Sequence, residues 1–347
     1  MNYIVFDLEW NQPADIGPVR KNKLSFEIIE IGAVKLDENK RIISKFSELV
    51  KPRVYNRLNW RTEKMLHISM RELRESGAYF SDVVNRFLKW CGEDYIFCTW
   101  GSQDLSELQK NLKYFHLRNL SNGPIKYYDV QKLFAAKMNE DGTSRSLETA
   151  VDMLELDKDI PFHRAYSDAY YTAKIFSKID DNILNNNFAY DLFHLPKDEL
   201  HEIYEENDNG CYYVSSAYKD REDITNNRRM LGINCPKCKW KVIRPKVRWF
   251  STNSKIYYGA AICIKHGPIK GKLRIKKHDN GLYFLEKFIE YTNYDEVNAI
   301  KEKKYSLKNK VNVNEEHVNE DSQKDKGSKG RYIKKPRSFF KAKKDKS

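Results

Sequence analysis

Five side chains in the first half of this 347-residue sequence have types and positions that suit metal-assisted hydrolysis: Asp7, Glu9, Asp104, His163 and Asp168. Carboxylate oxygens are hard ligands that favour Mg²⁺ or Mn²⁺ over zinc. Two such ions about 3.5–4 Å apart can activate water and stabilise the leaving oxygen when a phosphodiester is cleaved. Because histidine titrates near neutral pH, His163 is a candidate general base for that water.

Each of these residues has an ordinary explanation when it is taken alone. Asp104 and Asp168 fall at predicted helix starts, where a carboxylate interacts favourably with the helix dipole, and an isolated His163 would be a surface group. Asp7 and Glu9, however, occupy positions i and i+2 of a predicted strand and therefore point to the same face. Two anions held side by side repel each other and are tolerated mainly when a cation lies between them. The combination therefore favours a metal site.

The hydrophobic pattern predicts the elements that position these residues. Short apolar runs rich in β-branched and aromatic residues indicate five strands: Tyr3–Leu8, Ile28–Leu36, Ile42–Val50, Tyr95–Trp100 and Ile125–Asp129. Apolar residues at helical spacing indicate helices, with Ser81, Ser102 and Ser146 as expected N-caps and a last helix over residues 165–179. Three strands followed by alternating helices and strands predict an α/β domain with a mixed sheet.

A second group of residues has the spacing of a structural zinc site. Cys235 and Cys238 form a CxxC pair, and Cys263 and His266 form a CxxH pair that follows after 24 intervening residues. Three thiolates and one imidazole suit tetrahedral Zn²⁺, which would stabilise a small β-rich module with little core. The alternative is four unrelated groups in such a module.

The zinc-ribbon-like region also carries basic and aromatic residues. The candidates for contact with nucleic acid are Lys241, Arg244, Arg248 and Trp249. In this hypothesis, cations meet the phosphates of a single strand and aromatic rings stack on its bases. The alternative is that the aromatic residues belong to a core and the basic residues are solvated.

Charge is distributed unevenly along the chain. Lys and Arg number 62 against 49 Asp and Glu, which gives a formal net charge of +13. Residues 1–224 carry a net charge of −7, and residues 225–347 carry +20. A basic C-terminal third attracts polyanions such as nucleic acids.

Composition changes also predict the domain organisation. A polar, Asn-rich stretch follows residue 180, and beyond residue 300 aliphatic residues are scarce. We predict a domain over 1–180, a basic accessory module over 188–300 that starts with a helix over 188–206 and contains a zinc-ribbon-like region over 230–280, and a disordered basic tail over 301–347. The mean hydropathy of −0.75 and the lack of a long apolar run argue against a membrane-spanning helix. Because the first residues do not look like a signal peptide, we expect a cytoplasmic protein.

Three segments resemble the motifs of the DEDDh 3′–5′ exonuclease superfamily, also called DnaQ-like or RNase T-like: Ile4-Val-Phe-Asp-Leu-Glu9, Trp100-Gly-Ser-Gln-Asp104 and His163-Arg-Ala-Tyr-Ser-Asp168. The resemblance spans about residues 1–180 and implies a ribonuclease H-like fold with a mixed five-stranded sheet. It also implies release of nucleoside 5′-monophosphates from the 3′ end of RNA or single-stranded DNA, with two Mg²⁺ or Mn²⁺ ions. Asp7, Glu9 and Asp168 would hold one ion. Asp7, with Asp104 nearby or through water, would hold the second, and His163 would deprotonate water.

The resemblance leaves the substrate and the activity open to alternatives. The Trp-Gly-x-x-Asp form of the middle motif looks most like the Eri-like and KapD-like branch, which favours RNA. A DNA exonuclease of proofreading or repair type is one alternative, and a non-catalytic nucleic-acid-binding regulatory protein on the same scaffold is another. Trp10, directly after the first motif, could stack on the terminal base or belong to the core or a lid.

Overall fold

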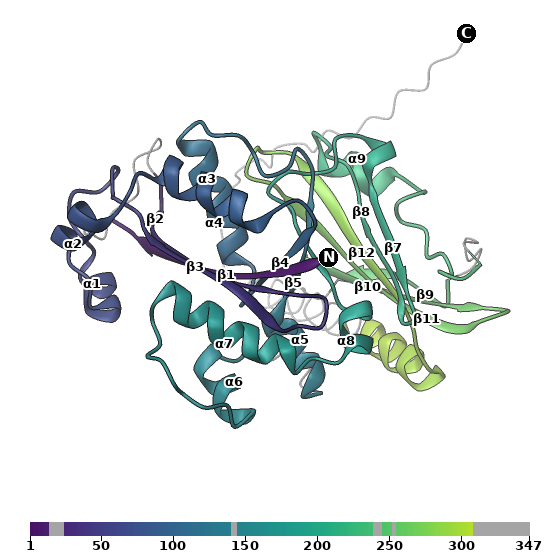
Figure 1. Cartoon of the computed structure of the whole chain (residues 1–347). Helices are drawn as coiled ribbons and strands as arrows, with labels where there is room; N and C mark the ends of the chain where they lie inside the picture. The colour runs from purple at the N-terminus through teal and green to yellow at the C-terminus, as the bar shows by residue number, and fades with distance from the viewer. Residues whose placement is uncertain (14–23, 140–143, 239–244, 252–254, 308–347) are drawn as a thin grey trace, which may run out of the picture. The chain divides into compact units, whose positions relative to one another are not determined.

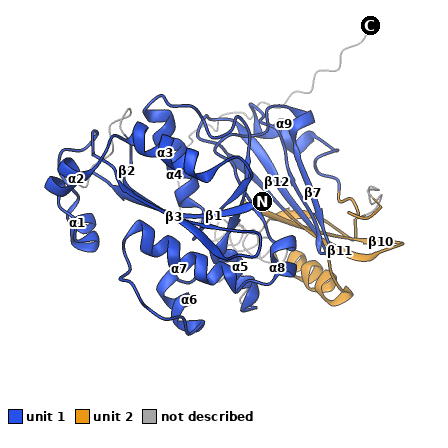
Figure 2. Cartoon of the chain, viewed as in Figure 1, with its two compact units in different colours: residues 1–232, 273–290 blue, residues 233–272, 291–347 orange. Residues whose placement is uncertain are grey.

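The structure is a computed structural model that describes residues 1–13, 24–139, 144–238, 245–251 and 255–307 (Figure 1). The chain divides into two compact units (Figure 2): unit 1 comprises residues 1–232 and 273–290, and unit 2 comprises residues 233–272 and 291–347. Unit 1 thus extends beyond residue 180, where the sequence predicts a boundary.

Unit 1 contains a six-stranded mixed sheet with the strand order β3-β2-β1-β4-β5-β6. Its strands are β1 (Asn2–Asn11), β2 (Glu27–Leu36), β3 (Ile42–Leu49), β4 (Tyr95–Thr99), β5 (Ile125–Asp129) and β6 (Ala189–Asp191). Strand β1 is antiparallel to β2 and parallel to β4. The predicted α/β class with a mixed sheet is confirmed, and β6 adds a short antiparallel edge strand next to β5.

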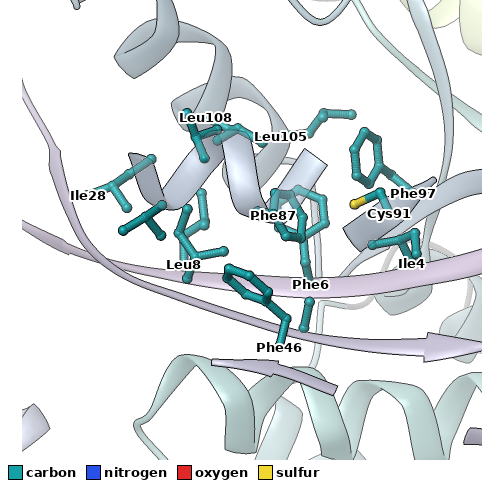
Figure 3. Packing of buried hydrophobic residues seen from close by; sticks show 14 of the residues in the cluster. Ile4, Phe6, Leu8, Ile28, Phe46, Phe87, Cys91, Phe97, Leu105 and Leu108 are labelled. Carbon is teal, nitrogen blue, oxygen red and sulfur yellow. The ribbon is translucent and has the colours of Figure 1, made fainter. Parts of the chain in front are cut away.

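Helices cover both faces of this sheet, because successive side chains of β1 point to opposite sides. One face packs against α3 (Phe80–Cys91) and α4 (Gln103–Tyr114), where Ile4, Phe6 and Leu8 meet Phe87 and Leu108 in the core (Figure 3). The opposite face packs against α5 (Val130–Lys137), α6 (Leu147–Met153), α7 (Ala165–Ser177) and α8 (Asp181–Asn186). Figure 1 shows α3 and α4 above the strands and α5–α7 below them. Two shorter helices, α1 (Trp60–Leu66) and α2 (Met70–Ser76), supply Leu66 and Leu73 to a small cluster with Ile29 of β2.

The predicted helix starts are partly correct. Ser146 is the N-cap of α6, and its side chain accepts a hydrogen bond from the Thr149 N–H group. Ser102 is the N-cap of α4, without a side-chain hydrogen bond. Ser81 is not an N-cap, because α3 already begins at Phe80, whose ring is buried in the core.

The predicted helix over residues 188–206 is wrong. This segment forms β6, a 3₁₀ turn over Glu199–His201 and β7 (Ile203–Asn207). Strand β7 is antiparallel to β8 (Gly210–Val214), and Ile203 packs with Val214 and Phe284 in an apolar cluster. Strand pairing and this cluster override the local helical pattern, as tertiary contacts often do.

The remainder of unit 1 extends this β-structure. Strand β8 also pairs antiparallel with β12 (Tyr283–Tyr291), and α9 (Arg221–Asn226) follows β8 in sequence. Strand β11 (Gly267–Lys277) contributes residues 273–277 to unit 1 and residues 267–272 to unit 2.

Unit 2 contains the antiparallel pair β9 (Val247–Ser251) and β10 (Ile256–Cys263). Residues 294–307 are helical, although the sequence predicts a disordered tail from residue 301. Val297 and Ile300, which precede the predicted tail, pack with Val247 and Ala260 and anchor this helix, and the helix continues into the first residues of the tail. Residues 308–347 of the predicted tail lie outside the described residues. Within the part of the chain that the structure describes, no helix combines the length and the apolar character needed to cross a membrane.

Candidate active site and candidate zinc site

Asp7, Glu9 and Asp168 converge in unit 1. Asp7 and Glu9 alternate along β1 with residues that pack against α3 and α4, so their side chains lie on the face covered by α7. Asp168 lies in the first turn of α7. One carboxylate oxygen from each of the three residues lies within 4.8 Å of the others, and all three residues are half-buried. The structure therefore brings together three of the four predicted acids.

Asp104, the fourth acid, reaches the end of β1 from α4. Its Oδ1 atom accepts a hydrogen bond from the Leu8 N–H group at 3.1 Å, and the residue is only 5% exposed. The pairing between β1 and β4 ends at Val5 and Cys98, so the Leu8 N–H group is not used by β4. Where the two parallel strands diverge, α4 thus places a carboxylate directly beside the residue between Asp7 and Glu9.

Gly32 allows α7 to approach Asp7. This glycine lies opposite Asp7 in the β1–β2 pair, and a Cβ atom at its position would lie 2.0 Å from the backbone nitrogen of Tyr166 and 2.1 Å from the carbonyl carbon of Ala165. Any side chain would therefore push the first turn of α7 away from the sheet. Because the first turn of α7 lies this close to β2, Asp168 lies beside Asp7 and Glu9 of β1.

His163 lies in the loop that leads into α7. Its backbone has a φ of 67°, in the left-handed region that non-glycine residues rarely adopt, and its N–H group donates to Asp168 Oδ1 at 3.3 Å. Its side chain is exposed. Strained backbone of this kind persists where the surrounding structure imposes it, often at functional sites. The fifth predicted residue therefore lies next to the carboxylates.

An ion pair that the sequence analysis missed holds this loop. Arg164 pairs with Glu30 of β2, whose side chain is only 3% exposed. Glu30 lies opposite Glu9 in the β1–β2 pair. Glu30 is flanked on both sides by isoleucines in β2, and this charged residue in an apolar run was the available sequence signal. Nothing in the sequence indicated that Arg164 would be its partner.

The four carboxyl groups resist ionisation in the folded protein. Burial, followed by the charges of Asp104 and Glu9, raises the pKa of Asp7 well above its usual range. Burial, followed by the charge of Asp168, raises the pKa of Glu9 to about 8. Burial raises the pKa of Asp104 to about 7, although the Leu8 N–H group opposes this effect. Burial also raises the pKa of Asp168 to about 6, against the His163 N–H group and imidazole.

These properties fit a divalent cation. Several acids that repel one another in a partly buried place are stabilised in ionised form by a positive ion. The donor set of this cluster consists of hard carboxylate oxygens, which suits Mg²⁺ or Mn²⁺. The residues present therefore match the metals that the sequence predicts.

Cys235, Cys238, Cys263 and His266 also converge, in unit 2. One ligand atom from each lies within 4.8 Å of the others. The Cys238 Sγ atom lies 3.4 Å from Cys263 Sγ and 3.2 Å from His266 Nδ1. Although burial raises the pKa of the Cys263 thiol, hydrogen bonds led by the His266 N–H group outweigh burial and lower it to about 6. The four groups have the composition and proximity of a tetrahedral zinc site.

The candidate nucleic-acid contacts are less clearly grouped. Trp10 is half-buried, with its ring 5.5 Å from that of Phe26. Trp249 is also half-buried and packs over Gly259, where an added Cβ would lie 3.0 Å from the indole. Arg248 is exposed. Lys241 and Arg244 lie outside the described residues.

A cluster of carboxylates from β1, α4 and α7 has the ligand types that divalent-metal catalysis of phosphodiester cleavage needs. The RNase_T exonuclease family model matches residues 4–176. The chain is 24% identical over 181 residues to the probable 3′–5′ exonuclease KapD of Bacillus subtilis, and this match covers 52% of the chain and 84% of KapD. The chain therefore belongs to the DEDDh 3′–5′ exonuclease superfamily, which confirms the family and the enzyme class predicted from its motifs.

Two solved nuclease structures are also similar to this chain. The nuclease domain of 3′hExo, a DEDDh family member bound to rAMP, is 19% identical with a TM-score of 0.44, and the match covers 51% of this chain and 90% of that one. Cell-death related nuclease 4 (CRN-4) is 19% identical with a TM-score of 0.42, and the match covers 51% of this chain and 62% of that one. The chain thus spans less than two thirds of the length of CRN-4.

Proposed function

We propose that this chain hydrolyses single-stranded RNA from the 3′ end in a divalent-metal-dependent reaction that releases nucleoside 5′-monophosphates. The observation that carries the proposal is the convergence of Asp7, Glu9 and Asp168 within 4.8 Å. The raised pKa values of Glu9 and Asp168 support it, because they indicate a carboxylate cluster in need of a cation.

In this proposal each residue has a separate role. Asp7, Glu9 and Asp168 would hold one Mg²⁺ or Mn²⁺ ion, and Asp7 with Asp104 would hold a second. The bound ions would supply positive charge for the attacking and leaving oxygens of the phosphodiester. His163 takes the proton from the attacking water, and its exposed position beside Asp168 leaves the imidazole open to substrate. The hydrogen bond from the Leu8 N–H group fixes the Asp104 carboxylate against β1.

A degradation assay tests this activity. We expect 5′-labelled RNA to shorten stepwise in Mg²⁺ or Mn²⁺ with release of mononucleotides, and we expect no reaction in EDTA. Asp168→Asn should abolish release while the protein stays folded. Asp82→Asn, which changes an exposed carboxylate in the first turn of α3, is the matched control and should retain activity. Full turnover by Asp168→Asn would remove the proposed site.

The choice of RNA rests on the form of the middle motif, Trp100-Gly-Ser-Gln-Asp104, which resembles the RNA-directed branch of the superfamily. Competition between RNA and DNA strands of the same sequence tests this choice. Faster hydrolysis of the DNA strand would assign the chain to DNA proofreading or repair. A folded protein that binds both strands and cleaves neither would be the non-catalytic regulatory protein.

We further propose that Cys235, Cys238, Cys263 and His266 hold one structural Zn²⁺. The proximity of three sulfurs and one imidazole nitrogen supports this proposal. Metal analysis of the purified protein should find about one equivalent of zinc, and replacement of Cys235 and Cys238 by Ser should remove it. Cys91→Ser, which alters a buried free thiol of α3, is the control and should retain zinc. A zinc-free protein with an intact fold would contradict the proposal.

The basic residues around this zinc site are proposed to attract the substrate. Arg248 is exposed on β9, and with Trp249 it belongs to the segment in which the sequence predicts contacts to single strands. Attraction by a basic region is useful here, because residues 1–224 carry a net charge of −7.

A further inference from the structure

A large groove in unit 1 is lined by α4 and by the hairpin that joins β11 to β12. Its volume is about 1170 Å³. A second hollow of about 580 Å³ shares several of its lining residues, among them Ser106, Asp191 and Lys276. We call the two hollows together the α4 groove. Ser102 and Ser106 line it at the end of α4 that also carries Asp104, and Lys113 lines it at the opposite end of the helix.

The larger hollow of the α4 groove is basic, although the first 224 residues have a net charge of −7. The positively charged or titratable side chains that line it are Lys110, Lys113, His116, His194, Lys276, Lys277 and His278, against two acids, Asp191 and Asp279. A cluster of cations in an acidic unit indicates a place for an anionic ligand.

Two of these lysines retain free charge. Lys110 pairs with Glu107 at 2.7 Å and Lys276 pairs with Glu286 at 2.5 Å, so neighbouring carboxylates neutralise both. Lys113 and Lys277, by contrast, form no ion pair with any carboxylate of the described residues. The Lys113 ammonium group lies 5.9 Å from the centre of the Phe193 ring, and the Lys277 ammonium group lies over Tyr283. Both lysines are exposed and remain available to phosphates.

Two histidines of the groove differ in their hydrogen bonding. His278 fixes the hairpin: its Nε2 atom lies 3.2 and 3.1 Å from the carbonyl oxygens of Leu192 and Phe193, and its Nδ1 atom accepts from the Asn280 N–H group. His194 differs, because its Nε2 atom is buried and has no hydrogen-bond partner among the described residues. A buried polar atom without a partner is costly and indicates a missing ligand or water.

We propose that the larger, basic hollow of the α4 groove binds the single-stranded RNA upstream of the 3′ end that enters the active site. Lys113 and Lys277 would contact phosphates, and a ribose 2′-hydroxyl, which can donate or accept, would pair with His194 Nε2. A DNA strand offers the same phosphates but no 2′-hydroxyl, so the groove favours RNA. The direction of the bound strand rests on the proposed function. The test below measures binding separately from hydrolysis, so the groove and the reaction can fail independently.

Binding measured without catalysis provides the test. Fluorescence anisotropy without added Mg²⁺ or Mn²⁺, and without a chelator that would remove the proposed structural zinc, would compare labelled RNA of about 15 nucleotides with DNA of the same sequence. We expect the Lys113→Ala/Lys277→Ala variant to bind the RNA roughly tenfold more weakly than the unaltered protein, and its salt dependence to be smaller by a slope of about 1.4, as loss of two phosphate contacts on a single strand predicts. The Lys89→Ala/Lys178→Ala variant removes two exposed lysines of unit 1 outside the groove and is the matched control.

The outcomes distinguish the groove from the proposed reaction. RNA binding by Lys113→Ala/Lys277→Ala equal to that of the control overturns the groove proposal, even if the unaltered protein hydrolyses RNA. A specific loss of RNA binding supports the groove, even if no hydrolysis occurs in Mg²⁺. Equal affinity of the unaltered protein for RNA and DNA overturns the assignment of the groove to RNA. His194→Phe should reduce the preference for RNA over DNA, and an unchanged preference overturns the role of the 2′-hydroxyl.

Discussion

Arg164 and Glu30 form a two-pronged ion pair, with Nε 2.9 Å from Oε2 and Nη2 3.0 Å from Oε1. The pair joins the residue that follows His163 to a residue of β2 that lies opposite Glu9. Burial is the main cause of the raised pKa of Glu9, and Arg164 acts in the opposite direction. One arginine therefore holds the loop of the candidate base and places a positive charge beside the carboxylates.

Arg164→Met should lower both stability and kcat. The substitution leaves the buried Glu30 carboxylate without its partner, which costs about 1–3 kcal/mol of unfolding free energy. It also releases the loop that carries His163. Urea denaturation and steady-state kinetics measure the two effects. Adding Glu30→Gln to this variant should recover most of the stability but not kcat, and a double variant with full activity would argue against a positioning role for Arg164.

Gly32→Ala should be strongly disruptive. The new methyl carbon would lie only 2.0 Å from the Tyr166 backbone nitrogen and 2.1 Å from the Ala165 carbonyl carbon, so α7 must move away from β2. We expect a loss of about 1–3 kcal/mol in stability and a large loss of activity. Gly123→Ala is the matched control, because a Cβ atom there meets nothing within 4 Å. Equal melting temperatures for the two variants would contradict the close approach.

Stability of the metal-free protein should fall as pH rises. The pKa values of Glu9, Asp104 and Asp168 are raised to about 8, 7 and 6 in the folded protein, against about 4 in an unfolded chain. Between about pH 4 and pH 8 the folded state binds more protons than the unfolded state. The contribution of these carboxyl groups to the free energy of unfolding is therefore complete below about pH 4 and is lost by about pH 8.

Denaturation without added Mg²⁺ or Mn²⁺, and without a chelator, at about pH 5 and pH 8 measures this effect. We expect a decrease of about 1–3 kcal/mol after allowance for solvent screening, and Mg²⁺ should offset it at the higher pH. Glu9→Gln removes one titrating group and should flatten the dependence. If the stability of the unaltered protein rises with pH, the pKa values of these carboxyl groups are not raised in the folded state.

His163→Ala should slow hydrolysis roughly 10²–10⁴-fold, as loss of a general base does. Asp168 should still support metal binding, so RNA affinity in Mg²⁺ should change little. His201→Ala, which alters another exposed histidine, serves as control. If His163→Ala keeps the rate and the pH profile of the unaltered protein, another group must accept the proton.

Local pattern predicted much of this protein. The apolar runs and their alternation with helical segments gave the five main strands, because each strand is long enough to show its burial in sequence. Asp7, Glu9, Asp104, His163 and Asp168 were recognisable by type and spacing as candidates for one site, and Cys235, Cys238, Cys263 and His266 as candidates for another; their roles stay predictions. A catalytic or metal-binding side chain must be of a particular residue type, and residue type can be read from the sequence alone.

Contacts between distant segments decided the remainder. Nothing local links Glu30 to Arg164, and the need for glycine at position 32 arises only because α7 packs across β2. Residues 188–206 form strands instead of a helix because their pairing partners, β5 and β8, are supplied by other parts of the chain. The α4 groove likewise combines α4 with a hairpin more than 150 residues further along the sequence. Such features depend on which surfaces meet in space, and a sequence pattern reports only what each segment buries by itself.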